Sequence, residues 1–118
     1  MNSIYNLLEK ISIRTAMYTG EYKLSNIRSF IDGYTFSIIE EKRRDEFFSD
    51  FSGFHDWIAT KYGFYESTAG WQNMILAIEM GLTPKKVQWE SISYVATEKD
   101  HIASVAKFFE LVEEYKNA

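Results

Sequence analysis

The two histidines, His55 and His101, are the side chains best suited to acid–base chemistry near neutral pH. Asp56 follows His55 directly. Because neighbouring residues on a helix point about 100° apart, the sequence does not make these two a hydrogen-bonded pair. His101 falls in the first turn of the last expected helix. We interpret both histidines as helix residues at the edge of a core rather than as members of a catalytic set.

Other patterns that support catalysis or cofactor binding are missing from the sequence. The chain has no cysteine, which excludes disulfides, thiolate metal sites and cysteine nucleophiles. It contains no paired histidines at metalloprotease spacing, no glycine-rich phosphate loop and no nucleophile elbow. We therefore expect a protein that is not an enzyme and that carries no metal and no cofactor.

A charged segment over residues 40–50 is the first candidate for partner binding. It is either a solvated turn between helices with local salt bridges, or an acidic edge that meets a basic partner. A second candidate is the aromatic connector Phe64-Tyr65-Glu66, which either covers the core or anchors a partner. The residues that we predict to contact a partner are Glu40, Glu41, Asp45, Glu46, Asp50, Tyr65 and Glu66.

Composition limits the class of protein. The chain has 118 residues with 13 basic and 17 acidic side chains, a formal charge of −4, and 46% hydrophobic residues. This length and balance fit one globular domain over residues 1–118. The acidic balance argues against a nucleic-acid binder. The sequence shows no secretory signal and no apolar stretch of membrane-spanning length, so we expect a cytoplasmic protein.

Apolar residues recur at helical spacing in six segments, and the alternation typical of strands is not seen. The stripes predict helices near residues 4–11, 27–38, 47–62, 71–78, 89–95 and 102–115. Start signals precede several of them, at Ser3, Ser25, Ser67 or Thr68, Thr83-Pro84 and Thr97. The stretch 12–23 loses the period and is expected to be a loop. The sequence therefore predicts a single compact all-α domain of about five to six helices.

Glycines add detail to these expected helices. Gly33 lies inside the second stripe, and we attribute it to a close contact between helices. Gly53 interrupts the third stripe, so that helix is expected to begin properly at Ser52 or Gly53. Gly63 follows the same helix and suits a left-handed residue at its end. The stripes place many aromatic residues in the core, Phe54 and Trp71 among them.

Several short strings of the sequence match elements of one kind of protein. Arg14-Thr15-Ala16-Met17-Tyr18-Thr19-Gly20 resembles an R-P-x-M-Y-x-G signature, with Thr15 in place of the usual proline. Further along the chain stand Phe30-Ile31-Asp32-Gly33-Tyr34, then Phe51, Phe54 and Trp57, then Gly70-Trp71, and finally Phe108, Phe109, Leu111 and Tyr115. Together, from Arg14 to Tyr115, they resemble small bacterial immunity proteins of the contact-dependent growth-inhibition type.

The resemblance implies a cytoplasmic protein that binds a cognate toxin domain, often a nuclease, and blocks its active site. The composition is compatible with this, because a mildly acidic chain would be steered toward a basic nuclease cleft. We expect a monomer or weak dimer. In the loop 14–20, Met17 and Tyr18 are expected to form a buried plug while Arg14 pairs with a carboxylate.

Two other functions stay open. The first is a regulatory or scaffold module that binds a host protein or peptide in a groove between helices. The second is an enzyme of an unrecognised type, which would need a concave pocket that gathers His55 or His101 with carboxylates.

Overall fold

The computed structural model describes residues 3–38, 40–48, 51–64 and 69–118. Its first helix, α1 (Ile4–Ile13), buries the predicted stripe of Ile4, Leu7, Leu8 and Ile11. Ser3 stands at the N-cap position with extended backbone, but its side chain makes no capping hydrogen bond. The apolar spacing rather than the cap therefore defines this helix.

The expected loop over 12–23 is wrong in its first half. The chain forms a further helix, α2 (Thr15–Thr19), which ends at Gly20 with φ +83°. Thr15 is buried and its hydroxyl donates to the Ile11 carbonyl at 2.8 Å. The predicted plug is also wrong for Met17, which is 70% exposed, whereas Tyr18 packs edge-on against Phe30.

The expected ion pair of Arg14 is absent from the described part of the chain. Its Nη1 lies 4.0 Å from the Met17 sulfur instead. The segment 14–20 is thus a short helix with an exposed outer side, because a single turn after α1 can bury only one face.

The segment between residues 24 and 62 contains three helices where the stripes predicted two. They are α3 (Leu24–Ser37), α4 (Glu41–Phe48) and α5 (Phe54–Tyr62). Residues 41–48 of the charged segment are therefore a helix and not a turn. As predicted, the helix after it begins at the glycine, since Gly53 is the N-cap of α5, and Gly63 ends it in the left-handed conformation.

The proposed reason for Gly33 is wrong. A Cβ built at this position would meet no atom within 4 Å, so Gly33 faces open space rather than a neighbouring helix.

The helix α6 (Trp71–Glu79) lies at the centre of the packing. It buries Trp71, Met74, Ile75, Leu76 and Ala77, and it packs against α3, α5, α7 and α8. Its predicted caps, Ser67 and Thr68, lie outside the described residues. Gly70, immediately before α6, has φ +90°, a conformation that side-chain-bearing residues rarely adopt.

The expected fifth helix is divided in two. A 3₁₀ turn, η2 (Pro84–Lys86), follows Thr83, and a short helix, α7 (Ile92–Val95), comes six residues later. Of the predicted apolar stripe, Ile92 is buried, but Val95 is 67% exposed. The weak periodicity of this segment is explained by its short elements.

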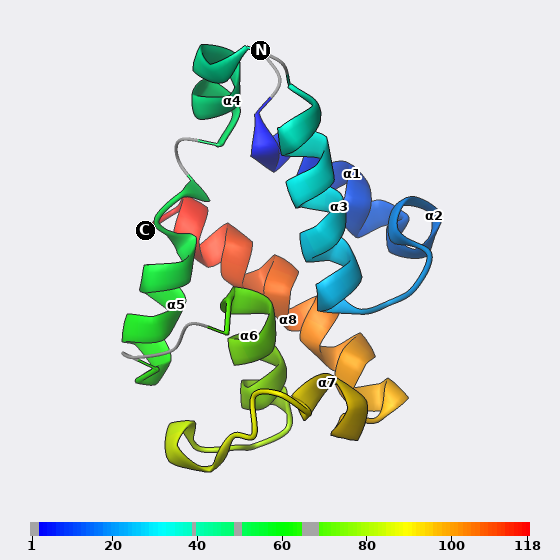
Figure 1. The fold of residues 1–118 in the computed structure, drawn as a ribbon, viewed down its shortest axis with the longest axis vertical. Coiled ribbons are helices and arrows are strands. Elements are labelled where there is room, and N and C mark those ends of the chain that lie inside the picture. Colours follow the sequence, from blue (N-terminus) through cyan, green and yellow to red (C-terminus); the bar gives the residue numbers. More distant parts are fainter. Residues whose placement is uncertain (1–2, 39, 49–50, 65–68) are drawn as a thin grey trace.

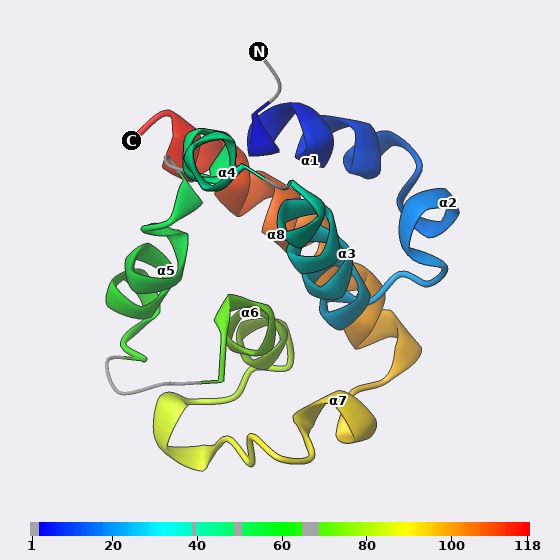
Figure 2. The ribbon, with the colours of Figure 1, turned by 45° about the horizontal axis from the view of Figure 1, so that its top comes forward.

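The last helix, α8 (Glu98–Lys116), is the longest and begins with the predicted capping arrangement. The Asp100 backbone N–H donates to the Thr97 hydroxyl at 3.1 Å, and the Thr97 N–H donates to the Asp100 carboxylate at 3.0 Å. This reciprocal pair satisfies two otherwise unpaired donors. The helix runs diagonally through the molecule, behind α3 and α6 (Figures 1 and 2).

Aromatic rings form the centre of the core, as the stripes predicted. Trp71 of α6 stacks on Phe108 of α8 at 4.6 Å, and Phe51 stacks on Phe54 at the same distance. Phe54 also meets Trp71 edge-on at 5.8 Å. The rings therefore join α5, α6 and α8 into one apolar cluster.

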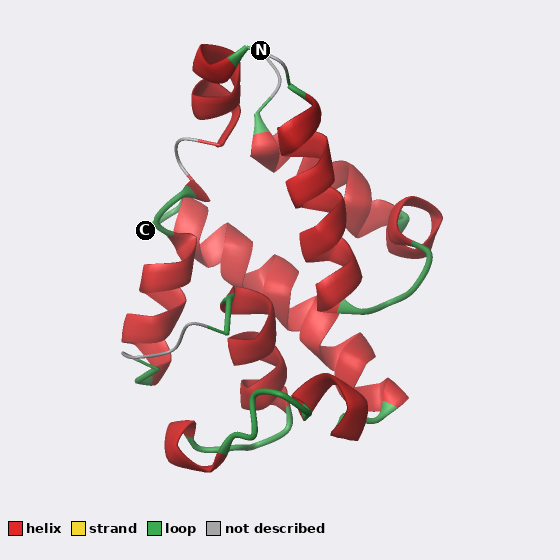
Figure 3. Ribbon diagram, in the orientation of Figure 1, coloured by secondary structure: helices red, strands yellow, loops and turns green. Residues whose placement is uncertain are grey.

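The all-α fold class is confirmed, with eight α-helices rather than five to six in the described residues. Figure 3 shows helices and connecting loops, with no strand in the part of the chain it describes. Among these helices, none is both long and apolar enough to cross a membrane.

Candidate protein-binding surfaces

The charged helix α4 lies at one end of the molecule, beside the C-terminal end of α3 (Figure 1). Phe47 is its buried residue and lies 5.4 Å, ring to ring, from Tyr34 of α3. Phe48 is half-buried and packs against Phe51, and Arg44 is also half-buried, whereas the other polar residues of the helix are exposed. The predicted contact residues Glu40, Glu41, Asp45 and Glu46 are all exposed.

The charged residues of α4 are distributed over different faces of the helix. Glu41 and Asp45 are four residues apart, so they lie on the same face of the helix, one turn above the other. Glu41 is also in the first turn, where the helix dipole favours a negative charge. Lys42 and Glu46, again four apart, place opposite charges together on another face. Arg44 lies three residues after Glu41 and Lys42 three before Asp45, so basic side chains flank this pair of carboxylates.

The other predicted contact residues can be placed only in part. Asp50, Tyr65 and Glu66 lie outside the described residues. Their neighbour Phe64 is buried, and its ring packs edge-on against Trp89 at 5.7 Å. The phenylalanine of this connector is therefore a core residue.

An exposed aromatic side chain near α4 was missed by the sequence analysis. Phe36, in the last turn of α3, is 82% exposed, and only residues 38–40 separate the end of α3 from the start of α4. It sits two residues after Tyr34, off the buried stripe of α3. That offset from the stripe is the signal that could have identified it.

A second surface, also missed, is a hollow of about 550 Å³ between the α2–α3 connection, α7 and the start of α8. Tyr22, Tyr94 and Ile102 line it with exposed apolar surface. Tyr94 is 89% exposed. The volume lies within the range of about 300–1,000 Å³ that is typical of ligand-binding pockets.

The polar groups of the hollow carry opposite charges. Glu21 and Lys23 form an ion pair at 3.1 Å. Glu98, in the first turn of α8, also lines the hollow, and its carboxylate makes no hydrogen bond or ion pair within the described structure. The carboxylate of Glu98 is therefore the uncompensated charge of this hollow.

The two histidines have different settings. His55 is half-buried on α5. His101 is 5% exposed at the hollow, where its Nε2 lies 3.0 Å from the Ser93 carbonyl oxygen. This bond ties the first turn of α8 to α7, so we interpret His101 as a structural residue. Within the described ranges, no three acidic or imidazole side chains are grouped to hold a metal ion.

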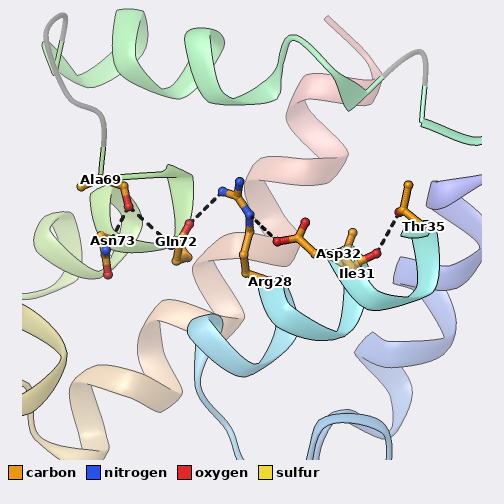
Figure 4. A network of polar contacts seen from close by, with 7 residues as sticks. All are labelled: Arg28, Ile31, Asp32, Thr35, Ala69, Gln72 and Asn73. Atoms are coloured by element: carbon orange, nitrogen blue, oxygen red, sulfur yellow. Dashed lines mark hydrogen bonds and ion pairs between the residues drawn. The ribbon is translucent and has the colours of Figure 1, made fainter. Parts of the chain in front are cut away.

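A polar network joins α3 to the start of α6 (Figure 4). Arg28 Nη1 donates to Gln72 Oε1 at 2.9 Å, and its Nε lies 3.4 Å from the Asp32 carboxylate. The guanidinium also lies over the Trp71 ring at 5.3 Å. Asn73 Nδ2 donates to the Ala69 carbonyl at 2.9 Å, which fixes the chain just before α6. We interpret this cluster as part of the scaffold that holds α3 in place.

Comparisons of the chain with protein-family profiles, curated proteins and solved structures give no match. Two surfaces are therefore the candidates for function: the charged helix α4 with Phe36, and the hollow beside α7.

Proposed function

We propose that this chain is an immunity protein that binds a bacterial toxin domain and neutralises it by blocking its active site. The resemblance of the motif strings between Arg14 and Tyr115 supports this proposal. The structural observation that carries it is an exposed phenylalanine, Phe36, next to a helix with exposed carboxylates.

The arrangement has the anatomy of a protein interface. Aromatic side chains are enriched at the centres of interfaces, and charged groups surround them. Burying a phenylalanine that is 82% exposed would favour association by about 1.5–3 kcal/mol. In this proposal, Phe36 is the anchor and the carboxylates of α4 form the rim.

The carboxylates of the rim suit a nuclease domain as the partner. An enzyme that holds a polyanion gathers basic residues around its cleft, and carboxylates on the inhibitor accelerate encounter with such a cleft. The Glu41–Asp45 face of α4 would occupy the position of the phosphate backbone. The formal charge of −4 on the whole chain acts in the same direction.

A second candidate function is a regulatory or scaffold module that binds a host protein or peptide. The hollow beside α7 favours it, because this hollow has apolar walls and a few polar groups, as peptide-binding grooves do. The two functions differ in the surface they use and in whether a toxin is the partner.

Co-expression with the product of the neighbouring gene, as the candidate toxin, tests the first function. We expect the chain to restore growth of cells that produce the toxin and to co-purify with the toxin domain. Phe36→Ala should weaken the complex, whereas Met17→Ala, which removes an exposed apolar side chain of α2, serves as the matched control. A toxin that stays fully active, with no complex, would reject the proposal.

A further inference from the structure

The hollow beside α7 combines two features that together select a ligand. Its walls present the aromatic rings of Tyr22 and Tyr94, and its rim carries the carboxylate of Glu98. Aromatic faces attract cations within about 6 Å of the ring centre, and a carboxylate adds an ion pair with the same cation. Both features favour a positively charged group over a neutral or negative one.

The remaining charges at the hollow agree with that preference. The ammonium of Lys23 is held 3.1 Å from Glu21, so its charge is largely offset. The N-terminus of α8 would attract an anion, but the capping pair of Thr97 and Asp100 already occupies two of its N–H groups. With Glu21 and Lys23 cancelling, Glu98 leaves the hollow with a net negative charge.

We propose that this hollow receives an arginine or lysine side chain from a protein partner, with Tyr22 and Tyr94 flanking its stem and Glu98 pairing with its charge. A volume of about 550 Å³ is larger than one such side chain and also accommodates the residues beside it. Val95, which follows Tyr94, is 67% exposed and extends the apolar surface beyond the hollow. A peptide segment therefore fits better than a free amino acid.

The proposal does not require the partner to be a toxin. It concerns a surface formed by the α2–α3 connection, α7 and α8, separate in the sequence from α4, and its experiment contains no toxin domain. If the peptide does not bind, the proposal of toxin neutralisation through α4 still stands. If the co-expression experiment fails, the proposal for this hollow still stands.

The test is a titration of the ¹⁵N-labelled full chain with the peptide acetyl-Gly-Arg-Gly-amide, followed by amide chemical shifts. Two matched peptides carry citrulline, the neutral isostere of arginine, or glutamate at the central position. We expect the arginine peptide to shift the amides of Tyr22, Tyr94 and Glu98, and the citrulline peptide to bind at least fivefold more weakly. The glutamate peptide should leave these amides unchanged.

Variants assign the binding to the proposed side chains. Glu98→Gln should weaken binding of the arginine peptide about threefold, and Tyr94→Ser should weaken it by a similar factor. Glu110→Gln, at an exposed position on the same helix, should have no effect. Because Tyr94 and Glu98 are exposed, both variants should keep the dispersed spectrum of the folded chain.

Several results would overturn the proposal. Equal binding of the arginine and citrulline peptides would show that the positive charge does not contribute to binding. Stronger binding of the glutamate peptide would show that the hollow prefers a negatively charged side chain. Tighter binding of free arginine than of the peptide would make the hollow a small-molecule site. Amide chemical-shift changes confined to residues outside the hollow would show that the arginine peptide binds at another site.

Discussion

Arg28 on α3 donates a hydrogen bond from Nη1 to the side-chain oxygen of Gln72 on α6, across 2.9 Å. The two residues are 44 positions apart in the sequence, and the bond joins the helix that carries Phe36 to the centre of the packing. The same guanidinium lies over Trp71, so one side chain connects the polar network to the aromatic core. This contact adds to the burial of Leu24, Ile27 and Ile31 in holding α3 against its neighbours.

Replacing Arg28 should therefore lower stability. We expect Arg28→Met to reduce the free energy of unfolding by about 1–2 kcal/mol, because it keeps an apolar stem over Trp71 but loses the charged hydrogen bonds. Arg28→Lys should recover only part of this loss, since an ammonium lacks the planar fork of a guanidinium. Urea unfolding followed by tryptophan fluorescence measures both. Arg43→Met on the exposed side of α4 is the control, and an equal loss there would contradict the role of Arg28.

Replacing Gly33, in contrast to Arg28, should raise stability. Because its Cβ position is open and lies within α3, Gly33→Ala should raise the free energy of unfolding by about 0.5–1 kcal/mol. Gly20→Ala is the matched comparison, and it should destabilise the chain because Gly20 has φ +83°. A destabilised Gly33→Ala variant would show that this face of α3 is covered after all.

The cap of α8 gives a third prediction. Thr97→Ala should cost about 1 kcal/mol of stability, because the Asp100 backbone N–H loses its acceptor. Thr83 also precedes a helical turn, but its side chain makes no capping bond, so Thr83→Ala should change stability by much less. Thermal unfolding by circular dichroism compares the two. Equal losses would mean that the cap does not stabilise α8.

The ion pair between Lys61 and Glu114 should make the free energy of unfolding depend on pH. Lys61 on α5 hydrogen-bonds to the Glu114 carboxylate on α8, and this bond raises the pKa of the lysine above its usual value. A group whose pKa is higher in the folded state stabilises the fold below its unfolded pKa, and loses that contribution as pH rises through the folded value. The pair should therefore contribute fully below about pH 10 and progressively less above it.

The measurement is the difference in stability between the wild-type chain and Glu114→Gln across pH 8 to 12. We expect a small difference at pH 8 that shrinks at alkaline pH and in 1 M salt, since both side chains are partly exposed. Glu113→Gln should show no such pH dependence. A difference that grows above pH 10 would contradict the assignment.

The sequence predicted the helices whose apolar residues follow a regular period. Ile4, Leu7, Leu8 and Ile11 are all buried in α1, and the rings of Phe54 and Trp71 lie in the core as expected. Burial of a stripe depends on spacing within one helix, and spacing is visible in the sequence. The prediction was wrong where elements are short, as in α2 and α7, because one turn of helix is too short to show a period.

The candidate surfaces could be predicted only in part. The exposure of Glu41 and Asp45 follows from their charge, but the sequence did not show that they lie on a helix. The hollow could not be predicted, because Tyr22 and Tyr94 come from distant segments and line the same hollow only through the packing of the chain. Their common feature in the sequence is that neither belongs to a predicted apolar stripe.

The association rate with a toxin domain, measured by stopped-flow fluorescence at several salt concentrations, tests the central claim that this chain acts by binding a basic protein partner through α4. We predict that Glu41→Lys/Asp45→Lys slows association at least tenfold at low salt and flattens its salt dependence. The double variant Glu110→Lys/Glu113→Lys on α8 changes the net charge equally and should slow association much less. Equal slowing by both variants, or an unchanged rate with the α4 variant, would contradict the account.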